Sequence, residues 1–287
     1  MGIFSARCTS LARLDGKTAV VTGSNTGIGK VTAQDFFQRG ARVIMACRNL
    51  EKANEAVKDI KENCSTQENV GELIATELDL SSLKSVRNCA KHLLDTEKRI
   101  DLLINNAGVM MCPKTITEDG YEMQFATNHL GHFLLTLLLL PKISQSTPAR
   151  IVNVSSIAHE RGKIDFTDIN CEKGKYKHNI QGVNVYSLHP GVIRTELGRH
   201  LNATLMWGAK LLWNVAGWFL FKTIHQGAQT TIYCAVDEKC ANETGLYYSE
   251  CAAKEPSKDA QNMEDAKKLW NVSLDLVGLP QDYNPFS

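Results

Sequence analysis

Between Lys17 and Ile193 the sequence alternates short apolar runs, rich in β-branched residues, with longer stretches of helical pattern. This alternation is typical of a parallel sheet with helices on both faces. Most of the apolar runs are too continuously apolar for strands with one face in water, so we expect buried central strands. The expected strands are Thr18 to Thr22, Ala41 to Ala46, Glu72 to Leu80, Asp101 to Asn105, Arg150 to Val154 and Val183 to Leu188.

The stretches between these strands predict helices. The predicted helices are Ile28 to Arg39, Glu51 to Glu62, Leu83 to Leu94 and Glu118 to Leu140. The 287 residues contain no internal repeat or low-complexity linker, so we predict a single doubly wound α/β domain. It is expected to span residues 17–287, after an N-terminal segment of residues 1–16, with a substrate lid and C-terminal helix in residues 197–287. Leu205 to Phe221 predicts a lid helix over an apolar pocket, or a helix at a membrane surface.

Charge and cysteine content argue against several classes of protein. The 32 Lys and Arg residues nearly balance the 31 Asp and Glu residues, so no overall field favours nucleic acid or an anionic bilayer. The nine cysteines are scattered without a C-x-x-C pair, which indicates reduced thiols rather than a disulfide framework or a zinc site. We expect no metal, and neither a signal peptide nor a transmembrane anchor is seen. These features predict a cytoplasmic location.

A glycine-rich turn joins the first expected strand to the first expected helix. It reads Thr22-Gly23-Ser24-Asn25-Thr26-Gly27-Ile28-Gly29, with the spacing G-x-x-x-G-x-G. Gly23 permits a sharp turn, Gly27 leaves no Cβ between backbone and pyrophosphate, and Gly29 lets the helix pack against the strand. Free N–H groups at the helix N-terminus can then bind phosphate. At this junction the pattern predicts a dinucleotide site in a Rossmann-like fold, with an ordinary glycine loop as the alternative.

The end of the second expected strand indicates which dinucleotide is bound. An NAD enzyme places an acidic residue there to bind the ribose 2′-hydroxyl. This chain instead has Cys47-Arg48-Asn49. A guanidinium can bind a 2′-phosphate bidentately, so Arg48 predicts NADP(H), with added positive charge from Lys30. The alternative is that Arg48 is a solvated surface residue.

Several further motifs follow the expected strands. They are Asp79-Leu80, Asn105-Asn106-Ala107-Gly108, Thr127-Asn128-His129-Leu130-Gly131-His132-Phe133, Val154-Ser155-Ser156 and His189-Pro190-Gly191-Val192-Ile193-Arg194-Thr195. Together with the glycine-rich turn, they resemble the motifs of the short-chain dehydrogenase/reductase superfamily, and the resemblance covers almost the whole chain. Ala46 to Asn49, Gln226 to Thr230 and Lys268 to Trp270 are most similar to its retinol dehydrogenase branch, whose members act as NADP(H)-dependent retinal reductases.

The resemblance implies a role for each motif. Asp79 and Leu80 would contact adenine, Asn128 would be the catalytic-site asparagine, and Ser156 would hydrogen-bond the substrate carbonyl. Thr195 would contact the nicotinamide carboxamide or the phosphates. The implied catalytic residues are therefore Asn128 and Ser156. The expected cofactor-binding residues are Gly23, Ser24, Asn25, Thr26, Gly27, Ile28, Gly29, Arg48, Asn49, Asp79, Leu80, Asn106, Ala107, Gly108, Pro190, Gly191 and Thr195.

The resemblance also implies an activity and a substrate. The expected enzyme is an NADP(H)-dependent oxidoreductase that reduces retinal or other lipophilic aldehydes, or oxidises the corresponding alcohols, by hydride transfer. Its expected partner is such a small lipophilic molecule, not nucleic acid. Members of this branch usually carry an N-terminal membrane anchor, so peripheral contact with the endoplasmic reticulum is the alternative to a purely cytoplasmic location.

One element of the family pattern is not found in this sequence. The family uses a tyrosine as acid and base, with a lysine four residues later that lowers the tyrosine pKa. Here Ile180 follows Tyr176 at that spacing, and Pro190 follows Tyr186. After Tyr176 the sequence passes directly to the approach to the last expected strand, so a helix-length segment is expected to be absent. The alternative function is therefore a catalytically impaired, truncated form that still binds nucleotide.

A few other side chains are candidates for a replacement proton donor. Tyr176 lies in a lysine-rich run that is better explained as a solvated loop. His129, His132 and His159 are better explained as packing or surface histidines than as acids.

Overall fold

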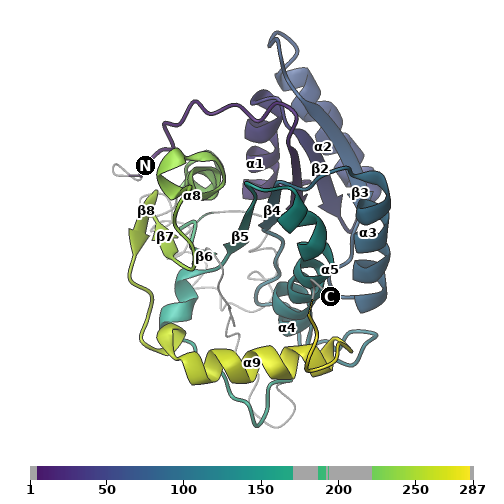
Figure 1. Cartoon of the computed structure of the whole chain (residues 1–287), viewed down its shortest axis with the longest axis vertical. Helices are drawn as coiled ribbons and strands as arrows, with labels where there is room; N and C mark the ends of the chain where they lie inside the picture. The colour runs from purple at the N-terminus through teal and green to yellow at the C-terminus, as the bar shows by residue number, and fades with distance from the viewer. Residues whose placement is uncertain (1–4, 171–186, 192, 194–221, 285–287) are drawn as a thin grey trace, which may run out of the picture.

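The computed structural model describes residues 5–170, 187–191, 193 and 222–284. Within these residues the chain forms one sheet with the strand order β3-β2-β1-β4-β5-β6-β7-β8 (Figure 1). All neighbouring strands are parallel except β7 and β8, which are antiparallel. The strands are β1 (Thr18–Thr22), β2 (Arg42–Cys47), β3 (Glu72–Glu77), β4 (Leu102–Asn105), β5 (Arg150–Val154), β6 (Ser187–Leu188), β7 (Tyr247–Ser249) and β8 (Ala252–Lys254).

Helices lie on both faces of this sheet, as the sequence predicts. The α-helices are α1 (Gly27–Gln38), α2 (Leu50–Asn63), α3 (Leu83–Thr96), α4 (Met123–Phe125), α5 (Gly131–Gln145), α8 (Ile224–Val236) and α9 (Met263–Leu276). The shorter turns are η1 (Ala126–Leu130), η2 (Ile157–Arg161), η4 (Glu238–Cys240) and η5 (Asp259–Gln261), of which η1 is a π-helix and the others are 3-10 helices. The prediction of a doubly wound Rossmann-like α/β domain is thereby confirmed.

Two hydrophobic cores follow from the alternation of side chains along the strands. In β1, Ala19 and Val21 face a core that is covered by α1, α2 and α8, whereas Val20 faces a second core. That second core is covered mainly by α3 and α5, with α9 at its edge. Both sides of β1 are buried, which explains why the sequence of this strand is apolar throughout.

The segment that follows β5 differs from an ordinary crossover helix. Only the 3-10 helix η2 and a series of turns occupy residues 157–170. Ile164, Phe166 and Ile169 of this stretch pack against the core beneath α3 and α5. The described part of this connection therefore contains no α-helix, in agreement with its irregular hydrophobic pattern.

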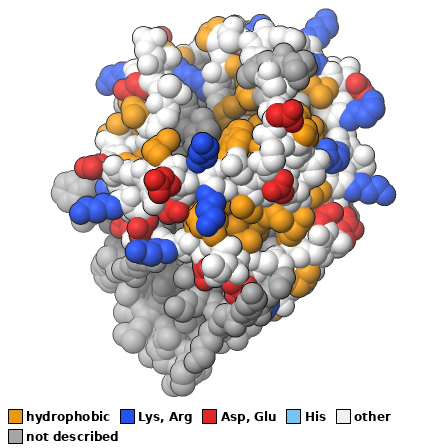
Figure 2. Space-filling model, turned by 60° about the horizontal axis from the view of Figure 1, so that its bottom comes forward, with side chains coloured by type: hydrophobic (Ala, Val, Ile, Leu, Met, Phe, Trp, Pro, Cys, Tyr) orange, Lys and Arg blue, Asp and Glu red, His pale blue; other side chains and the backbone are white. Residues whose placement is uncertain are grey.

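The C-terminal helix α9 fastens this side of the domain. The His129 Nε2 atom and the Ser273 hydroxyl hydrogen-bond at 2.7 Å, and the ring of Trp270 meets that of Phe133 edge-on at 5.1 Å. The Tyr121 hydroxyl donates to the main-chain oxygen of Leu276 at 2.6 Å. Trp270 nonetheless stays 46% exposed, and hydrophobic side chains gather on this side of the molecule (Figure 2).

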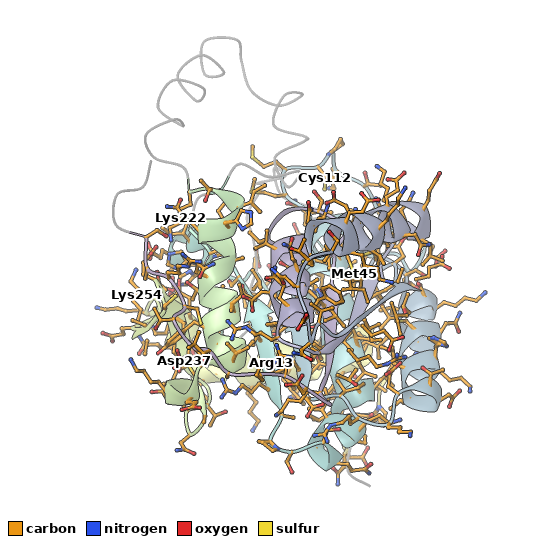
Figure 3. The ribbon with its side chains drawn as sticks, turned by 90° about the horizontal axis from the view of Figure 1, so that it is seen from above. Arg13, Met45, Cys112, Lys222, Asp237 and Lys254 are labelled. Atoms are coloured by element: carbon orange, nitrogen blue, oxygen red, sulfur yellow. The ribbon has the colours of Figure 1, made fainter. Side chains whose placement is uncertain are left out.

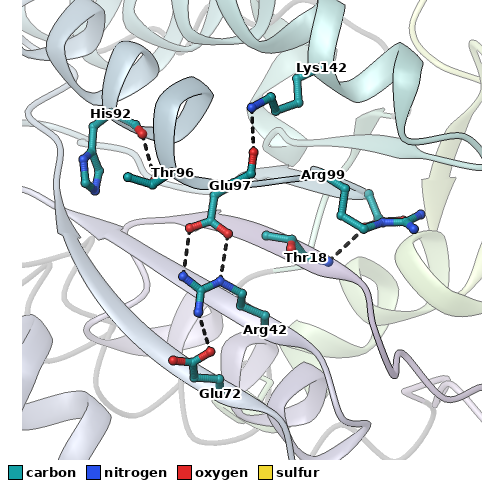
Figure 4. A network of polar contacts seen from close by, with 9 residues as sticks. Thr18, Arg42, Glu72, His92, Thr96, Glu97, Arg99 and Lys142 are labelled. Carbon is teal, nitrogen blue, oxygen red and sulfur yellow. Dashed lines mark hydrogen bonds and ion pairs between the residues drawn. The ribbon is translucent and has the colours of Figure 1, made fainter.

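A network of charged groups joins β2 to β3 and to the end of α3 (Figure 4). Arg42 donates two hydrogen bonds to the Glu97 carboxylate, at 2.8 and 3.0 Å, and also pairs with Glu72. Hydrogen bonding to Glu97 is the main cause that raises the pKa of Arg42 above its ordinary value. Lys142 of α5 donates to the main-chain oxygen of Glu97 at 2.6 Å. The network therefore connects α3 and α5 to the amino-terminal end of β2, which is the end of the sheet opposite the glycine-rich turn.

Some predicted boundaries were wrong. The expected strand Glu72 to Leu80 ends at Glu77, and the expected helix Glu118 to Leu140 begins instead at Met123 and continues, through the π-helix η1, to Gln145. The Glu122 carboxylate accepts the N–H groups of Gln124 and Phe125 and so fixes the true start. Of the expected strand Val183 to Leu188, only β6 lies within the described residues.

Candidate active site

The glycine-rich turn lies at the carboxyl end of β1 and leads into α1. Gly23 and Gly27 adopt positive φ angles of 62° and 60°, which side chains disfavour. Thr26 is the N-cap residue of α1, and its side chain makes no capping hydrogen bond. The first N–H groups of α1 are therefore not capped by Thr26 and can bind an anion.

Two of the glycines are required by close packing against the end of β4. A Cβ atom on Gly23 would lie 2.8 Å from the Cβ of Ala107. A Cβ atom on Gly29 would lie 2.6 Å from the main-chain oxygen of Gly23, and it would also meet the side chain of Asn106. The turn is thus shaped by the neighbouring loop as well as by its own backbone.

The remaining residues of the turn are held by the core on one side and exposed on the other. The Ser24 hydroxyl is buried and donates to the main-chain oxygen of Val21 at 2.9 Å. Ile28 packs against the core beneath α1, Asn25 is half-buried, and Thr26 is exposed. The turn therefore presents its backbone and Thr26 to solvent while Ser24 and Ile28 anchor it.

Thr22 joins the ends of β1, β4 and α5. Its hydroxyl oxygen accepts the N–H groups of Asn106 and Ala107, both at 2.9 Å, and lies 2.9 Å from Nε2 of His132. His132 Nδ1 donates to the main-chain oxygen of Asn128 at 3.2 Å, so its Nε2 is the acceptor for the Thr22 hydroxyl in the neutral ring. Burial lowers the pKa of His132 to about 4, which keeps the ring neutral. No local pattern in the sequence indicates this junction.

The Asn106 side chain forms hydrogen bonds through its amide nitrogen but not, among the described residues, through its amide oxygen. Its amide nitrogen donates to the main-chain oxygen of Thr22 at 2.8 Å. Its Oδ1 atom is buried and has no hydrogen-bond partner within the described part of the chain. A buried acceptor without a donor is costly, so this atom marks a place where a ligand donor would be favourable. Ala107 and the exposed Gly108 continue the loop.

Arg48 and Asn49 follow β2, and both are exposed. The Asn49 side chain accepts the N–H of Lys52 at 2.8 Å and is the N-cap of α2. Asn49 therefore caps α2, whereas the Arg48 side chain is exposed to solvent. Lys30 forms an ion pair with Asp59 of α2, so its charge is already partly compensated.

Asp79 and Leu80 lie in the loop between β3 and α3. The Asp79 carboxylate accepts the N–H and the hydroxyl of Ser81 at 2.9 and 2.6 Å. Leu80 is buried, and a Cβ atom on Gly131 would collide with its main-chain oxygen. The loop is therefore fixed by its own turn and by the start of α5.

Asn128 lies within the π-helix η1. Its Oδ1 accepts the N–H of Val109 at 2.8 Å, and its Nδ2 donates to the oxygen of Val109 at 2.9 Å. This reciprocal pair holds the loop that follows β4. Single π turns within helices occur frequently at functional sites, because they redirect one side chain. The helical pattern in the sequence did not reveal this turn.

Ser156 is the N-cap of η2 and lies two residues after the end of β5. Its hydroxyl accepts the N–H of Ala158 at 3.2 Å, and its main-chain oxygen accepts a hydrogen bond from Nδ1 of His159 at 2.8 Å. The N–H of Ser155 donates to the oxygen of Leu188 at 2.7 Å, which joins this turn to β6. Ser156 thus lies just beyond the end of the central strand β5, and Asn128 holds the loop that follows the central strand β4.

Pro190 and Gly191 follow β6 and are half-buried. Gly191 has a φ angle of 87°, and a Cβ atom there would lie 2.9 Å from the side chain of Lys222. Figure 3 shows Lys222 and Cys112 on the same side of the molecule. Thr195, Tyr176 and the expected lid helix Leu205 to Phe221 lie outside the described residues.

The part of the chain that the structure describes contains neither a metal-binding cluster nor a membrane-spanning helix. No group of three or more His, Cys, Asp or Glu side chains is arranged to hold a metal ion. Among the helices of those residues, none has the length and apolar character needed to cross a bilayer.

Comparison with known proteins adds evidence from outside the chain. The family model described as short chain dehydrogenase matches residues 17–205. Retinol dehydrogenase 13 of Mus musculus is 45% identical over 299 residues, which cover 95% of this chain and 87% of that protein. Retinol dehydrogenase 11 of Homo sapiens is also 45% identical over 299 residues, covering 97% of this chain and 91% of that protein.

Solved structures show the same fold. An uncharacterised protein from Mycobacterium paratuberculosis superposes with a TM-score of 0.71 at 28% identity, covering 98% of this chain and all of that chain (100%). RhlG of Pseudomonas aeruginosa, solved as an active-site complex with NADP, superposes with a TM-score of 0.60 at 25% identity. That match covers 82% of this chain and 94% of RhlG.

Proposed function

Because the chain belongs to the short chain dehydrogenase family, we propose that it is an NADP(H)-dependent oxidoreductase acting on lipophilic aldehydes and alcohols such as retinal and retinol. The observation that carries this proposal is the turn from Gly23 to Gly29, which leads into a helix start that Thr26 does not cap. The similarity to retinol dehydrogenases extends over nearly the whole chain and supports the substrate class.

The residues that are present fit a bound dinucleotide. The N–H groups at the start of α1 would bind the pyrophosphate. The buried Oδ1 of Asn106, which has no hydrogen-bond partner among the described residues, would accept a donor from the cofactor. Asp79 and Leu80 would hold the adenine, while Pro190, Gly191 and Thr195 would lie beside the nicotinamide. When bound, NADPH supplies the hydride.

The choice of NADP(H) over NAD(H) rests on Arg48. This exposed guanidinium follows β2, where a carboxylate would repel a 2′-phosphate. An arginine can instead bind that phosphate with two parallel hydrogen bonds. The NADP complex of RhlG supports the same cofactor for a related fold.

Ser156 and Asn128 would act on the substrate side of the site. Ser156 would donate a hydrogen bond from its hydroxyl to the carbonyl oxygen of the aldehyde, which favours negative charge developing there during hydride transfer. Asn128 would keep the loop after β4 in place through its paired hydrogen bonds to Val109.

The location of the protein in the cell, in the cytoplasm or at the surface of the endoplasmic reticulum, stays a prediction.

The source of the proton distinguishes this chain from the family pattern. No tyrosine in the sequence has a lysine four residues later. General acid catalysis typically accelerates a reaction by about 10²- to 10⁴-fold, so we expect turnover slower than in relatives by a factor in that range, with water as the donor. The same observation favours the second candidate function, a nucleotide-binding protein with little or no catalytic activity.

One experiment separates the two functions. Oxidation of NADPH would be followed by absorbance with all-trans-retinal, in wild type and in Ser156→Ala, after calorimetry has shown that both bind NADPH. Slow turnover that disappears in Ser156→Ala is the result expected for the enzyme. NADPH binding without any turnover in a folded sample would favour the non-catalytic function, and absence of NADPH binding would contradict both.

A further inference from the structure

The hairpin formed by β7 and β8 supports the turn that follows β6. His189 lies in that turn, and its Nδ1 atom hydrogen-bonds with the hydroxyl of Tyr247 in β7. Its Nε2 atom lies 3.3 Å from the hydroxyl oxygen of Ser249, and its backbone N–H donates to the oxygen of Tyr248 at 3.3 Å. Both ring nitrogens and the backbone of His189 are thus held by a single strand.

The ring of Tyr247 also contacts the turn that contains Ser156. Its centroid lies 4.9 Å from the ring of His159 and 5.7 Å from the ring of His189. His159 in turn donates from Nδ1 to the main-chain oxygen of Ser156. Only 4% of Tyr247 is exposed, so the phenol is packed between the two imidazoles. Tyr247 therefore connects the turn after β5 with the turn after β6.

A second contact from the same hairpin reaches Gly191. Glu250, in the turn between β7 and β8, forms an ion pair with Lys222. The side chain of Lys222 lies directly against Gly191, at 2.9 Å from where a Cβ atom would stand. Glu250 also accepts the N–H of Ala6 at 3.0 Å, which fixes the carboxylate from the other side. The turn from His189 to Gly191 is therefore supported at both of its ends.

The protonation states are consistent with this arrangement. Burial raises the pKa of Tyr247 to about 12, so its hydroxyl keeps its proton. Burial, followed by the nearby charge of Lys254, lowers the pKa of His189. With both groups neutral, the phenol donates to Nδ1, and the Nε2–H of His189 is left to donate to Ser249. Both ring nitrogens of His189 and the Tyr247 hydroxyl then have a partner of the right kind.

We propose that Tyr247 is a positioning residue that fixes the turn from His189 to Gly191 against the nicotinamide half of the dinucleotide, and fixes Ser156 through His159. This inference rests on the proposed function, because it needs a bound NADP(H). Tyr247 itself touches neither reacting atom in this scheme. It acts by keeping two loops from different strands in register.

The test compares a whole dinucleotide with half of one. Calorimetry would measure the binding of NADPH and of 2′,5′-ADP, which lacks the nicotinamide, to wild type and to Tyr247→Phe. The substitution keeps the ring and removes only the hydroxyl. Because it removes one hydrogen bond that supports the nicotinamide side, we expect NADPH to bind about threefold to tenfold more weakly while 2′,5′-ADP binds as before.

Tyr248→Phe is the matched control. Tyr248 is the next residue of β7, but it is buried in the core on the opposite face of the sheet, and its hydroxyl bonds Glu243. Loss of this hydroxyl removes a phenol hydrogen bond but leaves the backbone hydrogen bond between His189 and Tyr248 intact, so both ligands should bind as in wild type. If Tyr247→Phe merely destabilised the fold, the binding of both NADPH and 2′,5′-ADP would weaken, or Tyr248→Phe would show the same loss of binding. Ser249→Ala, which removes the partner of His189 Nε2, gives a second route should Tyr247→Phe fail to fold.

The outcomes separate this inference from the function on which it rests. Equal NADPH affinity in wild type and in Tyr247→Phe, or an equal loss for NADPH and 2′,5′-ADP, would overturn the positioning role alone. A wild-type chain that binds neither ligand would overturn the proposed function and this inference with it. Selective loss of NADPH binding in Tyr247→Phe and Ser249→Ala supports both.

Discussion

The side-chain amide nitrogen of Asn106 donates to the main-chain oxygen of Thr22 at 2.8 Å, and this bond joins the loop after β4 to the start of the glycine-rich turn. The same side chain lies against Gly29, where it leaves no room for a Cβ atom. Two loops that are far apart in the sequence thus fix each other. A change at Asn106 should therefore affect both the fold and the binding of nucleotide.

Asn106→Asp tests this relationship. A carboxylate in place of the amide would face the Thr22 oxygen without a proton to donate, and it would add negative charge near the expected phosphates. We expect the free energy of unfolding to fall by about 1–3 kcal/mol and NADPH affinity to fall at least about tenfold. Urea denaturation and calorimetry measure the two effects. Asn271→Asp, on the exposed side of α9, adds the same charge and should change neither.

Gly23→Ala separates crowding from backbone strain. Gly23 and Gly245 have similar positive φ angles, 62° and 71°, so alanine costs about 1–2 kcal/mol of backbone strain at either position. Only at Gly23 does the new Cβ also meet Ala107, whereas nothing lies within 4 Å at Gly245. We expect loss of NADPH binding and a larger drop in stability for Gly23→Ala alone. Similar behaviour of the two variants would contradict the assigned packing.

Arg48→Ala tests the choice of cofactor. Removal of the guanidinium should weaken NADPH binding by about 10- to 100-fold, since hydrogen bonds to charged groups contribute about 1.5–3 kcal/mol. NADH, which has no 2′-phosphate, should bind unchanged. Parallel titrations with the two cofactors measure the ratio, and Arg7→Ala, another exposed arginine, serves as the control. An unchanged ratio would mean that Arg48 is a surface residue only.

Acid should destabilise this protein through two buried histidines. Burial lowers the pKa values of His129 and His132 to about 4, well below the value of about 6.5 expected in the unfolded chain. Below pH 6.5 the unfolded state therefore binds protons that the folded state does not. Above that pH the two histidines should not reduce the free energy of unfolding. Between pH 6.5 and 4 each histidine should lower it by about 1.4 kcal/mol per pH unit.

Urea midpoints measured across this range, with His129→Gln and His92→Gln, check the assignment. His129→Gln should reduce the pH slope, because one of the two titrating groups is gone. His92 is exposed on α3, so its substitution should leave the slope as in wild type. A slope that is unaffected by His129→Gln would exclude this histidine as a cause.

The main features of the fold and the position of the nucleotide turn could be predicted because they depend on local patterns. The apolar runs of β1, β2 and β4 and the glycines after β1 are continuous in the sequence. The strands β7 and β8 have three residues each, too few for a period, and their pairing depends on a turn at Glu250 and Cys251 with positive φ angles of 52° and 54°. They were missed for this reason.

The contacts within the site could not be predicted in the same way. The Thr22 hydroxyl gains its role only when Asn106, Ala107 and His132 approach from other elements. Tyr247 and His189 likewise meet only across neighbouring strands of the sheet. Asn49 shows the converse, because Asn immediately before a helix is a common cap, so its hydrogen bond to the N–H of Lys52 is signalled by the local sequence.

The attachment of α9 has a consequence for how the protein is made. His129 lies in the helical turn that carries Asn128, and Phe133 lies one turn further on; their partners, Ser273 and Trp270, are both in α9, more than 130 residues later in the sequence. During translation the glycine-rich turn can form early, but the contacts of His129 and Phe133 with α9 form only after residues 263–276 have left the ribosome. A premature stop codon shortly before residue 263 would therefore remove both contacts beside the turn that carries Asn128.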